Sequence, residues 1–83
     1  MKILLADDEK PLLKFLARGL IAEGNECTSI SELHEVLPTI KTVSPQIVVL
    51  DRLFGTDDSL KVVAAIKALP CPPMILMLTA LDE

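Results

Sequence analysis

Three short apolar runs, each followed at once by a carboxylate or hydroxyl side chain, constrain the fold of this chain more than any other feature. The runs and the polar residues that follow them are 2–6 with Asp7 and Asp8, 46–50 with Asp51, and 74–78 with Thr79. Runs of this length, rich in Leu, Ile and Val, are typical of parallel strands covered on both faces. They predict buried strands whose carboxyl ends present polar groups.

Helical patterns follow two of these strands. Residues 10–23 repeat Leu at three- and four-residue steps, which predicts an amphipathic helix. Residues 60–69 carry a similar apolar stripe, and either Asp58 or Ser59 is placed to cap its start. Residues 52–58 between the strand and this helix are predicted to be a loop.

A weaker strand and a third helix complete the pattern. Residues 25–30 are short and polar enough for a strand at the edge of a sheet. Ser29 and Glu32 have the spacing of a capping box, so a helix is predicted to begin there. Pro38 lies inside that helical pattern and should kink or shorten the helix.

The resulting element order is β-α-β-α-β-α-β. Strands that alternate with helices predict an α/β fold with a parallel sheet, right-handed crossovers and helices on both faces. We expect the flavodoxin-like strand order 2-1-3-4, which places the first and third strands side by side where the order reverses. Ligands in such sheets bind beyond the carboxyl ends of the strands, which is where the polar residues lie.

Composition excludes several classes of function. The chain has 83 residues and a net charge of -4, which fits one small domain over residues 1–83 and leaves no basic surface for nucleic acid or anionic lipid. No apolar run approaches the roughly 20 residues that cross a bilayer, and the early Asp7 argues against a secretory signal. We expect a cytoplasmic chain in which Cys27 and Cys71 are free thiols.

The carboxylates predict a metal-assisted chemistry. If the first and third strands are neighbours, Asp7, Asp8 and Asp51 converge, and three carboxylates at close range repel one another or recruit a cation. An oxygen-only site without His or Cys suits Mg²⁺. An aspartate beside Mg²⁺ can act as a nucleophile toward phosphorus, and Thr79 could donate a hydrogen bond to a phosphoryl oxygen.

Three segments resemble the signature segments of the two-component response-regulator receiver family, whose members are CheY-like. They are Lys-Ile-Leu-Leu-Ala-Asp-Asp-Glu, Ile-Val-Val-Leu-Asp and Ile-Leu-Met-Leu-Thr-Ala, in the same order and at similar spacing. The resemblance implies a phosphoacceptor at Asp51, which receives its phosphoryl group from a sensor histidine kinase and so controls an output domain or partner. It implies a signalling module and not an enzyme, apart from its own phosphorylation and dephosphorylation.

The resemblance also implies individual roles. Mg²⁺ would be bound by Asp8 and Asp51 with help from Asp7, and by the backbone carbonyl of Leu53. Thr79 would be the hydroxyl that senses the phosphoryl group and switches the conformation.

Two kinds of departure accompany these matches. Gly55 stands where the family usually has proline, and Ser59 stands where it usually has glycine, so both are expected to soften the loop after the acceptor. The lysine that the family places at the end of its fifth strand has no counterpart among the 83 residues. A receiver domain that lacks the last helix, strand and helix is therefore expected.

Other interpretations remain open. An inactive receiver could serve as a dimerisation or protein-interaction module, forming a homodimer or strand-exchanged dimer through the uncovered edge of its fourth strand. An aspartate-nucleophile phosphatase would also need Mg²⁺, but such enzymes typically show Asp-x-Asp after the first strand. Asp57 and Asp58 are interpreted as helix caps, and His34 as a surface residue.

Overall fold

A four-stranded parallel sheet organises the chain. The computed structural model describes residues 1–78. The strands of this sheet are β1 (Lys2–Ala6), β2 (Glu26–Ile30), β3 (Ile47–Asp51) and β6 (Met74–Leu78). Their order is β2-β1-β3-β6, all neighbours run parallel, and β2 lies at one edge. The predicted 2-1-3-4 order is confirmed, since β6 is the fourth strand of this sheet.

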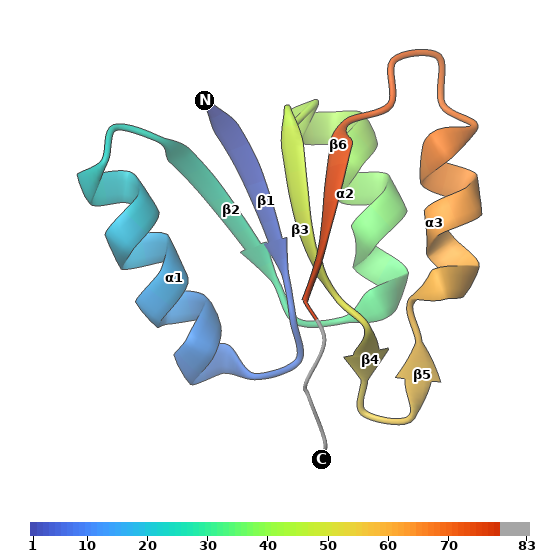
Figure 1. Cartoon of the computed structure of the whole chain (residues 1–83), viewed down its shortest axis with the longest axis horizontal. Helices are drawn as coiled ribbons and strands as arrows, with labels where there is room; N and C mark the ends of the chain where they lie inside the picture. Colours follow the sequence, from blue (N-terminus) through green and yellow to red (C-terminus); the bar gives the residue numbers. More distant parts are fainter. Residues whose placement is uncertain (79–83) are drawn as a thin grey trace.

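Helices cover both faces of the sheet, as predicted. Helix α1 (Lys10–Ala22) lies on one side, whereas α2 (Val36–Val43) and α3 (Leu60–Lys67) lie on the other (Figure 1). The α1 side has a small core of Ile3, Leu5 and Leu13. The opposite side has the larger core, and its buried members are Leu4, Ala6, Ile30, Val36, Ile40, Val48, Leu50, Phe54 and Ile66.

The segment that leads into α2 differs from its prediction. Ser29 belongs to β2, where it pairs with Leu5 of β1, so the predicted capping box does not form. A short 3-10 helix, η1 (Leu33–Glu35), precedes α2 instead. Pro38 is the third residue of α2, in the first turn, where a missing N–H costs no helical hydrogen bond. Sheet pairing therefore moved the start of the helix, and α2 is short.

The predicted loop over residues 52–58 is a β-hairpin. Strands β4 (Leu53–Phe54) and β5 (Asp57–Asp58) pair antiparallel around a two-residue turn. Gly55 has a φ of 61° at the first turn position, which a type II′ hairpin turn requires and which glycine adopts without strain. Phe54 is 6% exposed and belongs to the larger core. The buried phenyl ring and the glycine turn explain why this segment is ordered as a hairpin.

Strand β6 is less covered than its sequence predicts. Met74 and Leu76 are 68% and 55% exposed. They pair in register with Ile47 and Val49 of β3, so they share the sheet face on which α1 lies. Because α1 packs against β1 and β2, this half of the face has no cover among residues 1–78. The expectation that the fourth strand is buried on both faces is wrong for the described residues.

Two further observations concern the cysteines and the length of the helices. Both Cys27 and Cys71 are free thiols. Among residues 1–78, no helix has the length and apolar character needed to cross a membrane.

Replacing a leucine by alanine should destabilise the covered part of the sheet more than the uncovered part. Leu50 is fully buried, so Leu50→Ala should lower the free energy of unfolding by about 2–5 kcal/mol through lost burial and a residual cavity. The matched change Leu76→Ala on the neighbouring strand should cost less than about 0.5 kcal/mol. Urea unfolding followed by far-UV circular dichroism measures both, and equal losses would contradict the burial described above.

Candidate functional site

Three carboxylates meet at the carboxyl edge of the sheet. Asp7 is 4% exposed, Asp8 is exposed and Asp51 is half-buried. One carboxylate oxygen from each of the three residues lies within 4.8 Å of the others. The structure thus brings together the three acidic residues that the sequence placed at strand ends, and we call them the acid cluster.

The pairing of β1 with β3 creates this proximity. The two strands run parallel in register, with Ala6 opposite Leu50. The residues that follow, Asp7 and Asp51, therefore leave the sheet next to each other. The strand order reverses at this point. The chain passes from β1 to β2 on one side of β1, and the next connection places β3 on the other side.

Main-chain donors orient two of the carboxylates. Asp7 Oδ1 accepts a hydrogen bond from the Glu9 N–H at 2.9 Å, and Asp8 Oδ2 accepts one from the Gly55 N–H at 2.9 Å. The second bond joins the β1–α1 loop to the tip of the hairpin. The acid cluster is thus held by local turns and by a contact between distant parts of the chain.

Burial and mutual repulsion disfavour the charged forms of two members of the cluster. Burial raises the pKa of Asp7, and the charge of Asp8 adds to the increase. Burial also raises the pKa of Asp51, and the charges of Asp7 and Asp8 raise it further, whereas a hydrogen bond from the Leu53 main chain opposes the shift. A cation placed among these carboxylates would relieve the repulsion.

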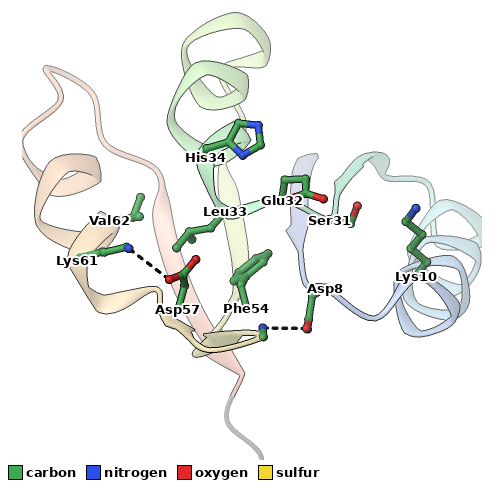
Figure 2. A pocket seen from close by; sticks show the side chains of 11 residues that line it. Asp8, Lys10, Ser31, Glu32, Leu33, His34, Phe54, Asp57, Lys61 and Val62 are labelled. Carbon is green, nitrogen blue, oxygen red and sulfur yellow. Dashed lines mark hydrogen bonds and ion pairs between the residues drawn. The ribbon is translucent and has the colours of Figure 1, made fainter.

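Two clefts adjoin the acid cluster. One, of about 810 Å³, is lined by all three carboxylates and by Arg52, Leu53 and Leu78, among others. The other, of about 490 Å³, lies beside Asp8 between η1, the hairpin and α3 (Figure 2). His34 is exposed at its wall, in agreement with the surface position expected for it. Among the described residues, Asp51 is therefore reachable from solvent through the larger cleft.

An ion pair lies at the base of the hairpin. Arg52 Nε and Nη2 donate to the two carboxylate oxygens of Asp58 at 2.9 Å and 3.0 Å. Asp58 Oδ1 also accepts the Leu60 N–H at 2.9 Å, so the predicted cap of α3 is formed by Asp58. These partners lower the pKa of Asp58. Asp57, expected to be a cap as well, lies in β5 and pairs with Lys61 at 3.7 Å.

The hydroxyl of Ser59 is the contact that sequence reasoning missed. Its Oγ lies 2.6 Å from the main-chain carbonyl oxygen of Asp51 and 3.0 Å from that of Arg52, and its single hydroxyl proton can donate to either. A serine before a helix is normally taken for a cap, so the only available signal pointed elsewhere. Gly55 and Ser59 were expected to soften this segment, yet both take part in hydrogen bonds that tie it to the acid cluster.

Two predicted site residues remain, Leu53 and Thr79. Leu53 lies in β4 opposite Asp58 and lines the larger cleft, with a side chain that is 52% exposed. Thr79, the predicted switch hydroxyl, lies outside the described residues.

Comparison with known proteins connects this geometry to a family. No protein-family model matches the chain. The alkaline phosphatase synthesis transcriptional regulatory protein PhoP of Bacillus subtilis is 33% identical over 82 residues, which are 99% of this chain and 34% of PhoP. The chain thus spans about a third of the length of this relative.

Solved receiver structures match the whole described fold. The N-terminal domain of a response regulator receiver protein from Methanoculleus marisnigri JR1 has a TM-score of 0.88 and 25% identity, covering 99% of this chain and 68% of that one. A signal receiver domain from Bermanella marisrubri has a TM-score of 0.90 and 23% identity, covering 98% and 69%. At that identity the second match supports the fold alone. With its flavodoxin-like sheet and its similarity to PhoP, the chain has the fold of the response-regulator receiver domains.

Proposed function

We propose that this chain is the phosphoacceptor module of a two-component system, and that Asp51 accepts a phosphoryl group from a sensor histidine kinase in the presence of Mg²⁺. The observation that carries the proposal is the acid cluster, in which three carboxylate oxygens lie within 4.8 Å at the strand-order reversal of a receiver fold. Residues 1–83 would act together as one receiver unit, and phosphorylation would control an output domain or a partner.

The donor set of the acid cluster fits Mg²⁺. All of its side-chain ligands are carboxylate oxygens, and Mg²⁺ prefers one or two carboxylates together with water and phosphate oxygens. Asp8 is exposed, which leaves room for the water that Mg²⁺ retains. Asp8 and Asp51 would bind the ion directly, Asp7 would assist, and the Leu53 carbonyl would complete the protein ligands.

The chain's own residues would carry the transfer as follows. A carboxylate oxygen of Asp51 attacks the phosphorus atom of phosphohistidine, and the new O–P bond forms as the P–N bond breaks. The electron pair of the broken bond stays on the imidazole nitrogen, which takes up a proton. Bound Mg²⁺ would neutralise charge on the phosphoryl oxygens. Asp7, bonded to the Glu9 N–H, would hold its free oxygen toward the cluster, and Thr79 would sense the product.

Phosphorylation should require Asp51 and should not require an acid outside the acid cluster. Incubation with phosphoramidate and Mg²⁺ should add the mass of one phosphoryl group, as followed by intact-protein mass spectrometry. Asp51→Asn should abolish the adduct because the amide is not a nucleophile. The control Asp57→Asn changes an acid of the nearby hairpin outside the acid cluster and should keep the adduct. An adduct that survives Asp51→Asn would refute the assignment.

Asp7→Asn should have opposite effects on stability and on metal binding. Because burial raises the pKa of Asp7 in the fold, the protonated form favours folding, and stability falls as the pH rises from the ordinary Asp value through the raised value. Without Mg²⁺, Asp7→Asn should therefore raise the free energy of unfolding at neutral pH, and the difference should vanish in acid.

At neutral pH, added Mg²⁺ should raise the free energy of unfolding of wild type more than that of Asp7→Asn. Binding to the folded state alone stabilises it, and wild type should gain more than Asp7→Asn because the variant has lost one carboxylate. Urea unfolding in acid and at neutral pH, each with and without MgCl₂, measures these differences. A wild-type chain whose stability ignores Mg²⁺ would count against the metal site.

A second candidate function is a dimerisation module, and it rests on β6. The outer edge of β6 has no partner strand among residues 1–78 and contains neither charge nor proline over Met74–Leu78. Exposed apolar edge strands of this kind pair with other chains. A second copy could add its β6 to this edge and cover Leu76.

Self-association should respond to a charge placed on β6. Leu76→Lys should reduce the dimer fraction in sedimentation velocity, because a lysine on an edge strand opposes pairing and must be desolvated. Ile21→Lys, a matched change at a 55% exposed position on α1, should leave the dimer fraction unchanged. A wild-type chain that stays monomeric at high concentration would eliminate this candidate.

A further inference from the structure

Ser59 occupies an unusual position between the hairpin and α3. It is fully buried, and its Oγ lies 2.6 Å from the carbonyl oxygen of Asp51 and 3.0 Å from that of Arg52. The Ser59 N–H donates to the same Arg52 carbonyl at 2.8 Å. One residue thus directs two donors at the main chain of the proposed phosphoacceptor.

The N–H group of the peptide that joins Asp51 to Arg52 also makes a hydrogen bond. The Arg52 N–H donates to the carbonyl of Leu78, at the end of β6, at 2.8 Å. The peptide between Asp51 and Arg52 is therefore held on one side by β6 and on the other by Ser59. Its orientation sets the direction in which the Asp51 side chain leaves the end of β3.

Helix capping does not account for the hydroxyl. A capping serine accepts a hydrogen bond from the first turn of its helix, and Ser59 makes no such bond at the start of α3. Asp58 does so through its contact with the Leu60 N–H. A single hydroxyl proton can serve the Asp51 or the Arg52 carbonyl, and either bond fixes the same stretch of main chain.

We propose that Ser59 is a positioning residue for Asp51, and that its hydroxyl holds the acceptor carboxylate in line with Asp7 and Asp8. Without the hydroxyl, the Asp51 carbonyl loses its bond to the start of α3, and the carboxylate gains freedom to turn away from the acid cluster. This inference rests on the proposed phosphoacceptor function. Displacements of this kind lower the rate of transfer in the folded protein, whereas a purely structural role would lower only the folded fraction.

The test compares Ser59→Ala with Thr56→Ala. Both delete a hydroxyl from the hairpin segment, but Thr56 is exposed at the turn and its hydroxyl contacts neither the acid cluster nor its main chain in the part of the chain described. The rate of phosphorylation by phosphoramidate is measured over a Mg²⁺ series and divided by the folded fraction from circular dichroism. At saturating Mg²⁺ we expect Ser59→Ala to be slower by about tenfold or more, and Thr56→Ala to stay within about twofold of wild type.

Each outcome decides the inference. A Ser59→Ala rate per folded molecule within about twofold of wild type overturns the positioning role and leaves the phosphoacceptor function intact. A wild-type chain that takes up no phosphoryl group refutes the proposed function, and the inference with it. If Ser59→Ala does not fold, Ser59→Cys keeps the side-chain size with a weak donor, and an undiminished rate in that variant overturns the inference.

Discussion

Parallel pairing of β1 with β3 is the constraint on which the rest of the structure depends. The pairing places Asp7 beside Asp51 at one edge of the sheet, and Asp8 follows on the same loop. Burial raises the pKa values of Asp7 and of the half-buried Asp51, and repulsion among the three carboxylates adds to the increase, so the charged cluster carries an electrostatic cost. The cost concerns the same groups that a divalent cation would neutralise. Stability and the proposed metal binding would therefore be coupled through the acid cluster.

The β4–β5 hairpin extends this coupling to the other half of the chain. Its tip bonds to Asp8 through the Gly55 N–H, and Ser59 at its exit bonds to the Asp51 carbonyl. The Arg52–Asp58 pair closes the base of the hairpin, although it is well exposed and so adds little stability by itself. The hairpin segment thus contacts the loop after β1 and the end of β3, which supply the carboxylates. Hydrogen bonds of this segment therefore connect the acid cluster to the start of α3.

Uneven burial of the two sheet faces has a different consequence. The face under α2 and α3 holds the larger core, whereas α1 covers only the part of its face over β1 and β2. Met74 and Leu76 remain exposed on the uncovered part, beside a strand edge without a partner among residues 1–78. Any chain that binds there would gain apolar burial and backbone hydrogen bonds together. Asp51 of the acid cluster and this edge lie on neighbouring strands, β3 and β6.

The sequence by itself predicted the four strands of the parallel sheet, their order and the carboxylates at the ends of β1 and β3, because apolar runs and strand–helix alternation depend on short-range patterns and on the general rules of parallel sheets. Tertiary structure decided the rest. Ser29 pairs with Leu5 instead of capping a helix, since a sheet partner outweighs a local cap. The hairpin forms because Phe54 finds a core built from distant strands, and the Ser59 hydroxyl meets the Asp51 carbonyl only after α3 docks. Such contacts join residues whose separation no local pattern encodes.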